Sequence, residues 1–350
     1  MAASRRRAAI QDMFRLVEAK YGDFSSLARP LRGRDPVLVV PTLTRDALAD
    51  LFSHRVAAVR VPGFYPADSA ALLAARMRTD PAIARQNWQI SVAARGLEST
   101  DVTAAGGTPH NVAAGDASGA ALEKYFDSAL PAMRQLRRMD YAAPSSSSSP
   151  PPPPPPPPPS SSSSSSSQVP SQQHSFLPPI DQLRLELDEV WPEGATVAKD
   201  KATGRAHMAG IGRIVHGPTQ WERGFCHADD LGVMSVSSGT FSANVYLQMP
   251  QAPGGATAGA LSIWDIQIDS RWDFYRHAHT LSQLTAQCEE GQERLRAVLP
   301  PPLTIVPDVG DLVLLCVQRP HAVDGFRAGT RVSQQCFLSV DKGDPIRLDS

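Results

Sequence analysis

The sequence predicts an α+β protein whose second half is mainly β, with strands arranged as an antiparallel barrel or sandwich. From about residue 205 to 340, short β-prone runs alternate with Gly, Pro and Asp turns, a pattern typical of antiparallel sheets. Before this region, apolar residues recur at helical spacing. We expect strands at 211–216, 241–249, 260–268, 311–318 and 331–340.

Four segments have the apolar spacing of helices that pack on a core. The apolar residues of the first are Ile10, Met13, Phe14 and Val17, and Gly22 follows them. The other three helices are expected at about 68–77, 120–140 and 180–190, the first of these after a short strand at 55–61. A further helix or long loop is expected at 281–298, between strands.

A low-complexity tract divides the chain. Ten prolines at 150–159 lie between runs of serine at 145–149 and 160–167. Such a tract cannot pack a core, so it should be disordered or stiffly extended. A proline run could dock an SH3-type or WW-type partner, but a homopolymer without flanking specificity residues favours a tolerated insertion. We therefore expect a mostly helical N-terminal part at 1–143, a disordered insert at 144–175 and the β core at 176–350.

The composition excludes several classes of function. Lys and Arg number 34 and Asp and Glu 35, so the net charge of -1 provides no broad positive field for a nucleic acid or an anionic membrane. The four cysteines form no CxxC pair, which argues against a zinc cluster or a disulfide scaffold. No apolar run is long enough to span a bilayer. We expect a soluble, cytoplasmic protein, with organelle targeting through the Arg-rich opening of the chain as the alternative.

A histidine and a carboxylate two residues apart begin a candidate metal site. In an extended segment, His227 and Asp229 point to the same side and can meet one ion. His321 follows 94 residues after His227, just beyond an apolar strand. It would complete a set of two histidines and one carboxylate that leaves three coordination positions open. Asp230 could replace Asp229 if the backbone bulged locally.

Two neighbouring features have simpler explanations. His277 and His279 form a second candidate chelate, but no acidic partner is placed beside them, so we expect them in a solvated loop. Cys226 directly precedes His227 and is expected to be a small buried apolar residue.

An arginine lies ten residues beyond His321. Arg331 begins a strand in which it shares one face with Ser333 and Gln335, whereas the opposite face is mostly apolar. An arginine buried beside a metal is costly unless an anion pairs with it. A dicarboxylate cosubstrate would supply that anion in a bidentate geometry.

With these residues in place, the segment from about 205 to 340 resembles the iron(II)- and 2-oxoglutarate-dependent oxygenase superfamily. The similarity is carried by the order His-x-Asp, distal His and Arg-x-Ser. The segments that look like the family's central strand and its turn before the distal histidine are Gly254-Gly255, 259–265 and 307–311. The resemblance implies a double-stranded β-helix, a cupin-like jelly-roll barrel with the metal inside and N-terminal helices flanking it.

The resemblance also implies a role for each matched residue. His227, Asp229 and His321 would bind iron(II) and form the catalytic centre. Arg331 would pair with the distal carboxylate of 2-oxoglutarate, and Ser333 would hydrogen-bond to it. Halogenating members have a small residue in place of the carboxylate ligand, so Asp229 argues against halogenation.

Further residues and the reaction follow from the same resemblance. Asn244 and Tyr246 share one face of the strand at 241–249 and are weaker candidates for the cosubstrate pocket, and Arg213 and Trp264 are weaker still. The enzyme would use iron(II), 2-oxoglutarate and O2, release succinate and CO2, and hydroxylate an aliphatic C–H bond of a small molecule such as an amino acid. Three alternatives stay open: a protein (prolyl-type) hydroxylase, a non-catalytic cupin-like binding protein, and an interaction protein that acts through the Pro/Ser tract.

Overall fold

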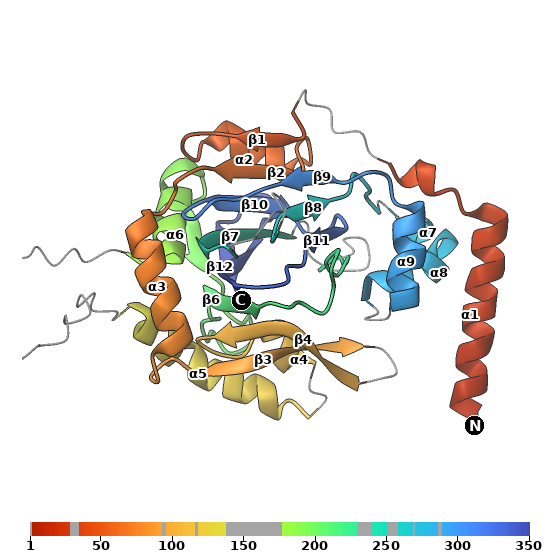
Figure 1. Cartoon of the computed structure of the whole chain (residues 1–350), viewed down its shortest axis with the longest axis horizontal. Coiled ribbons are helices and arrows are strands. Elements are labelled where there is room, and N and C mark those ends of the chain that lie inside the picture. Colours follow the sequence, from red (N-terminus) through yellow and green to blue (C-terminus); the bar gives the residue numbers. More distant parts are fainter. Residues whose placement is uncertain are drawn as a thin grey trace, which may run out of the picture.

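A large mixed β-sheet forms the centre of the molecule, with helices packed on one face and a smaller sheet on the other (Figure 1). The computed structural model describes residues 2–28, 35–92, 96–115, 118–137, 177–229, 240–250, 258–268, 270–285 and 289–350. The Pro/Ser tract lies outside the described residues. The domain boundaries expected at 143/144 and 175/176 therefore stay a prediction.

The large sheet contains ten strands within the described ranges. Its path is β1-β2-β10-β7-β12-β6-β4-β3, with β13 beside β12 and β5 beside β13. The strands are β1 (Val37–Val39), β2 (Ala58–Val61), β3 (Arg85–Val92), β4 (Gly96–Ala105), β5 (Ala195–Val197), β6 (Ile211–His216), β7 (Thr240–Gln248), β10 (Leu312–Cys316), β12 (Thr330–Ser339) and β13 (Ile346–Asp349). Neighbours are antiparallel except β1 with β2 and β13 with β5. Strands β6, β7, β10 and β12 confirm four of the expected strands.

The smaller sheet faces the inner side of the large one. It consists of β8 (Leu261–Ile263), β9 (Leu303–Ile305) and β11 (His321–Val323), in the antiparallel order β11-β8-β9. β8 confirms the expected strand at 260–268, in a shorter form. A buried apolar cluster joins Tyr246 and Val313 of the large sheet to residues of the small sheet. One end of the space between the sheets is therefore filled by apolar side chains.

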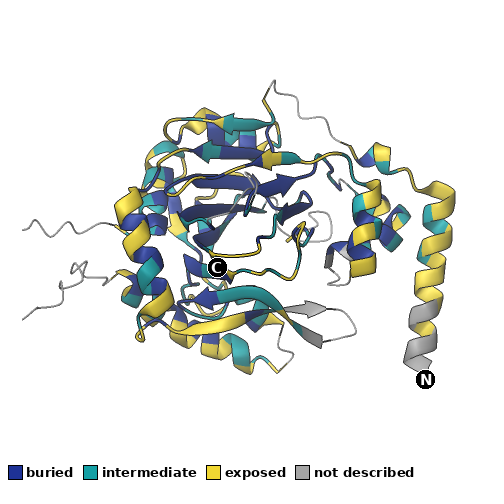
Figure 2. Ribbon diagram, in the orientation of Figure 1, coloured by how far each residue is buried: buried dark blue, intermediate teal, exposed yellow. Residues whose placement is uncertain are grey.

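Helices cover the outer face of the large sheet, as Figure 2 shows by the dark blue of the central strands beneath them. They are α2 (Arg45–Phe52), α3 (Ala67–Thr79), α5 (Ala120–Arg137) and α6 (Pro179–Val190), with the short α4 (His110–Ala114) before α5. Leu73 of α3 and Leu187 of α6 belong to the same buried cluster as Val245 and Cys336 of the sheet. The helices expected at about 68–77, 120–140 and 180–190 are thus confirmed.

The first helix, α1 (Ala2–Tyr21), forms as expected but does not pack on the central core. Ile10 is 48% exposed and Met13 is 50% exposed, because α1 contacts only a peripheral group of short helices (Figure 1). This group comprises α7 (Arg271–Arg276), α8 (Ala278–Leu281), η2 (Ser282–Thr285) and α9 (Glu289–Val298), with η1 (Phe24–Leu27) following α1. The expected packing was wrong because α2, α3, α5 and α6 already cover the sheet. None of the described helices combines the length and apolar character needed to cross a membrane.

Strands β3 and β4 form a hairpin that extends the large sheet beyond β6. β4 pairs with β6, where Val102 lies opposite Val215 and Ala104 opposite Arg213. Sequence periodicity does not predict this hairpin, since both of its strands are rich in polar residues. The hairpin nevertheless forms one wall of the cavity described below.

A pair of histidines lies in an aromatic cluster between α4, α5 and the chain before β6. The rings of His110 and His207 lie 4.6 Å apart, and both contact Phe126. Burial lowers the pKa of both imidazoles, and the charge of His110 adds to the effect on His207, whose pKa falls to about 4. Both rings are therefore neutral in the folded protein at neutral pH.

This pair should make the protein sensitive to acid. Below pH 6.5 the unfolded chain binds protons at these histidines while the folded protein does not, so the free energy of unfolding should fall as the pH drops from 6.5 to 4. For His207 the loss is at most about 3 kcal/mol. His207→Phe should remove that part of the pH dependence in urea unfolding between pH 7 and 4.5. The control is His216→Phe at an exposed position of β6, and a His207→Phe protein that loses as much stability as the wild type would contradict the prediction.

Candidate metal centre

His227 and His321 face each other across a short antiparallel backbone bridge. The amide of His227 donates to the carbonyl of His321 at 2.9 Å, and the amide of His321 donates back at 2.8 Å. Their rings lie 4.4 Å apart. The bridge extends the small sheet on the free side of β11, so strand pairing itself places the two imidazoles together.

A backbone carbonyl orients each imidazole. The Nδ1 of His227 lies 2.9 Å from the carbonyl oxygen of Phe225, and that of His321 lies 2.9 Å from the carbonyl oxygen of Arg319. When Nδ1 carries the proton and donates to these carbonyls, Nε2 keeps its lone pair for a metal. Both Nε2 atoms lie 3.5 Å from the Asp229 carboxylate. The three side chains therefore offer ligand atoms within 4.8 Å of one another, as one ion requires.

The charges of these groups suit a divalent cation. Burial, and then the neighbouring His321, lower the pKa of His227 to about 4, so its imidazole is neutral near pH 7. Burial raises the pKa of Asp229, but the hydrogen bond to His321 and the charges of both histidines outweigh burial and hold it well below its usual range. Neutral imidazoles and an ionised carboxylate are the forms that bind metals. The alternative ligand Asp230 lies outside the described residues.

The segment before His227 is held in place from two sides. Gly224 has φ +72°, and a Cβ there would lie 2.1 Å from the carbonyl oxygen of Val323, so only glycine lets the segment approach β11. On the other side, the Gln292 amide of α9 accepts from the Cys226 amide at 2.8 Å and donates to its carbonyl at 2.9 Å. Cys226 is fully buried, as expected, and burial raises the pKa of its thiol to about 12.

The partner segment before His321 depends on a buried ion pair. Arg319 is 1% exposed and donates to Asp265 at 2.5 Å. The amide of Trp264 also donates to the carbonyl of Pro320 at 2.9 Å. These contacts fix the carbonyl of Arg319, and this carbonyl in turn orients His321.

Arg331 lies on the inner face of β12, beside the metal ligands. Its guanidinium lies 5.1 Å over the ring of Tyr246, and the side chain is 5% exposed. Within the described part of the chain, no carboxylate lies within ion-pair distance of Arg331. Its Nε and the hydroxyl of Ser333 also have no hydrogen-bond partner. A buried cation and a buried hydroxyl without partners are the groups that a bound anion would satisfy.

The weaker candidates lie on the same face of the large sheet. Strand register places Tyr246 opposite Ser333 and Asn244 opposite Gln335. Both are buried in the sheet: the Asn244 amide donates to Ser242, and Tyr246 packs with the apolar cluster between the sheets. The structure therefore puts them on the predicted face, but, like Ser333, they are not among the residues that line the cavity at His227 and Asp229.

A cavity of about 170 Å³ opens onto His227 and Asp229. Arg213 of β6 and Arg331 and Gln335 of β12 contribute the polar part of its wall. Trp88, Thr100 and Val102 of the β3–β4 hairpin, together with Trp221 and Phe225, contribute residues that no sequence motif indicated. Their participation depends on the long-range pairing of the hairpin with β6, which local periodicity does not reveal.

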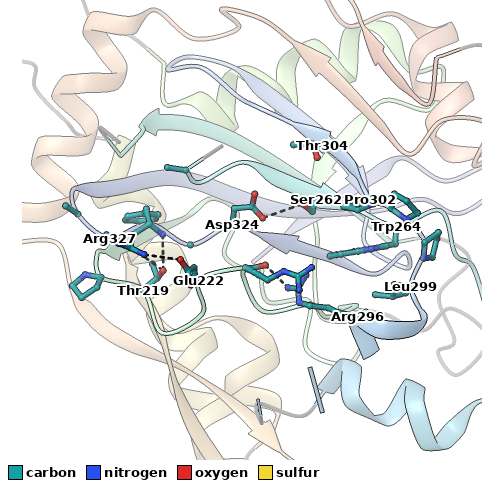
Figure 3. A pocket seen from close by; sticks show the side chains of 18 residues that line it. Thr219, Glu222, Ser262, Trp264, Arg296, Leu299, Pro302, Thr304, Asp324 and Arg327 are labelled. Atoms are coloured by element: carbon teal, nitrogen blue, oxygen red, sulfur yellow. Dashed lines mark hydrogen bonds and ion pairs between the residues drawn. The ribbon is translucent and has the colours of Figure 1, made fainter. Parts of the chain in front are cut away.

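A second and larger cavity, of about 1060 Å³, is shown in Figure 3. Asp324, Gly325 and Phe326 line both this cavity and the one at His227 and Asp229. Trp264, which with Arg213 was one of the two weakest candidates, lines this second cavity and not the one at His227 and Asp229. Arg296 lies 5.4 Å from its ring and donates to the carbonyls of Arg223 and Gly224, both at 2.6 Å. This cation is therefore satisfied by the chain itself, unlike Arg331.

The second candidate chelate is corrected by the structure. His277 is fully buried at the junction of α7 and α8, not in a solvated loop. Its Nδ1 lies 2.8 Å from the carbonyl of Asp273, and its Nε2 accepts from the Asp23 amide at 3.0 Å. Both ring nitrogens thus serve to join the chain after α1 to the peripheral helices.

Comparison with known proteins gives only distant similarity. No protein-family model matches the chain, and no curated protein matches it. An N-substituted L-amino acid dioxygenase from Burkholderia ambifaria AMMD is 13% identical, covering 76% of this chain and 100% of that chain at a TM-score of 0.40. An oxidoreductase of the 2OG-Fe(II) oxygenase family from Burkholderia pseudomallei is 13% identical, covering 89% of this chain and 98% of that chain at a TM-score of 0.35. A prolyl-4-hydroxylase from Pseudomonas putida is 15% identical, covering 86% of this chain and 98% of that chain at a TM-score of 0.32.

The metal centre makes a direct prediction about metal affinity. His227→Ala removes one of three ligand atoms, so the affinity for Co(II), used as a stable substitute for iron(II), should fall by at least about a hundredfold. Isothermal titration under nitrogen measures this change. His216→Ala, at an exposed position of β6, is the matched control and should bind as the wild type does. Equal affinity in the two variants would show that His227 is not a ligand.

Proposed function

We propose that the protein is an iron(II)- and 2-oxoglutarate-dependent dioxygenase that hydroxylates an aliphatic C–H bond of a small molecule such as an amino acid. One observation carries the proposal: Arg331, which has no ion-pair partner among the described residues, lines the same cavity as His227 and Asp229, two members of the candidate metal group. A metal alone would not account for a buried arginine, and an anion alone would not account for the three ligands. A cosubstrate that chelates the metal at one end and pairs with arginine at the other accounts for both.

The strand order supports a double-stranded β-helix. Successive segments alternate between the sheets, except that β8 and β9 both belong to the small one: β6, β7, β10 and β12 lie in the large sheet, and the His227 bridge, β8, β9 and β11 on the small side. Within each group neighbours are antiparallel, in the orders β10-β7-β12-β6 and His227-β11-β8-β9. This is the arrangement of a jelly-roll, in which two sheets enclose the site.

In the proposed function, the residues of the chain bind the metal and the cosubstrate, and the bound groups carry out the oxidation. His227, Asp229 and His321 hold the metal on one side and leave its other positions open. Arg331 pairs with the distal carboxylate of 2-oxoglutarate, and the Ser333 hydroxyl donates to the same carboxylate. Iron(II), when bound, supplies the oxidative chemistry with the cosubstrate and O2, while the chain fixes the geometry and excludes water. The apolar walls from the β3–β4 hairpin suit the aliphatic part of a small substrate.

The proposal predicts a visible charge-transfer band when iron(II) and 2-oxoglutarate are added without O2. Arg331→Ala should weaken 2-oxoglutarate binding by about 2 kcal/mol or more, because it removes the partner of a buried carboxylate. Titrating the band against 2-oxoglutarate measures the affinity. Arg327→Ala, which removes an exposed arginine, is the control. If iron(II) binds but 2-oxoglutarate produces no band in the wild type, the cosubstrate assignment is wrong.

A further inference from the structure

A second arginine faces the same cavity. Arg213 lies on β6, directly opposite Ser333 in the register with β12, and its side chain lines the cavity that contains His227 and Asp229. Its guanidinium lies 5.0 Å over the ring of Trp88, and one of its nitrogens donates to the Gln335 amide oxygen at 2.5 Å. The stacking and the neutral amide fix the guanidinium in place but do not neutralise its charge.

No acidic side chain of the described residues forms an ion pair with Arg213, and its Nε has no hydrogen-bond partner. Two other carboxylates line the cavity but are engaged elsewhere. Asp101 accepts from the Gln220 amide at 2.6 Å, and Asp324 lies 3.5 Å from the Ser262 hydroxyl. Asp229 influences Arg213 electrostatically, but it is already assigned to the metal.

Three other buried or half-buried arginines each have a carboxylate partner. Arg319 pairs with Asp265 at 2.5 Å, Arg60 with Asp311 at 2.6 Å and Arg76 with Asp80 at 2.9 Å. Burial and the nearby Arg331 lower the pKa of Arg213 to about 10, which still leaves it charged near pH 7. An arginine that is half-buried, held in one orientation and left without a counter-ion is expected to bind an anion from outside.

2-Oxoglutarate alone would leave one of the two arginines without a counter-ion. Its two carboxylates are both used in the proposed function, one at the metal and one at Arg331. We propose that Arg213 binds a carboxylate group of the primary substrate, so that the protein selects small aliphatic acids over neutral analogues.

The proposal rests on the proposed function, because it assumes that metal and cosubstrate fill their sites. It assigns specificity to the large sheet and the hairpin. Arg213 fixes the acidic end of the substrate, and Trp88, Val102 and Val215 provide an apolar wall for its chain. The carbon to be oxidised would then lie between Arg213 and the metal ligands, and its distance from the carboxylate would set the position of hydroxylation.

The experiment uses the full chain loaded anaerobically with iron(II) and 2-oxoglutarate. The probes are the free L-amino acids, each compared with the matching carboxamide at the α-carboxyl position. Binding is read as a change in the charge-transfer band, and turnover as succinate release after O2 is admitted. The wild type should respond to at least one acid and bind its carboxamide at least about thirtyfold more weakly.

Arg213→Gln should form the unperturbed band with unchanged 2-oxoglutarate affinity but lose at least about thirtyfold in affinity for that acid. Arg213→Lys, which keeps the charge without the fork geometry, should recover part of the loss.

If Arg213→Gln binds the acid as the wild type does, or if no acid perturbs the wild-type band, the assignment is overturned. If it weakens 2-oxoglutarate instead, Arg213 is the cosubstrate's partner and the proposal is also overturned. Failure of the band to form in the wild type would contradict the oxygenase function itself.

A stability measurement separates this role from a structural one. An unpaired buried charge opposes folding, so Arg213→Met should leave the ligand-free protein at least as stable to urea as the wild type. A residue retained only for its contact with Trp88 and Gln335 would destabilise the protein when removed. A large loss of stability in Arg213→Met, with substrate affinity retained in Arg213→Gln, would identify Arg213 as a structural residue.

Discussion

The backbone bridge between His227 and His321 is the constraint on which the rest of the site depends. It joins two segments far apart in the chain, and it does so with main-chain hydrogen bonds that no side-chain substitution removes directly. Because opposite residues of an antiparallel pair project to the same side, the bridge brings the two imidazoles together before any metal is bound. Gly224 and Gln292 hold one segment and Arg319 the other, so the ligand geometry is built into the ligand-free protein.

The cavity beside this bridge lowers the stability of the folded protein, because it contains two arginines without counter-ions in the described part of the chain. Arg213 and Arg331 line one cavity, and neither forms an ion pair with a carboxylate of the described residues. Buried charges left unpaired cost several kcal/mol each, so this arrangement persists only because the surrounding sheets are held by large apolar clusters. Bound anions would relieve the repulsion, and the affinity for them is correspondingly increased.

The candidate metal ligands were easier to predict from the sequence than the residues that surround them, for a physical reason. The period of two in an extended chain places His227 and Asp229 on one side, and the structure shows Ala228 buried between them. The helices on the sheet were also predictable, since their buried faces repeat at 3.6 residues. The β3–β4 hairpin was not, because its polar strands owe their position to pairing with β6. The packing of α1 was not predictable either, since the apolar face of a helix does not indicate which other elements pack against it.

The functional groups divide between the two sheets. The metal ligands belong to the small sheet side, at β11 and the bridge, whereas the two arginines belong to β6 and β12 of the large sheet. A molecule that contacts both must therefore span the gap between the sheets, with anionic groups toward the large sheet and its reacting part toward the small one. Under the proposed function, the cosubstrate and an acidic substrate would each use its own arginine. Two arginines without ion-pair partners among the described residues, and not one, would match a site for two acidic ligands.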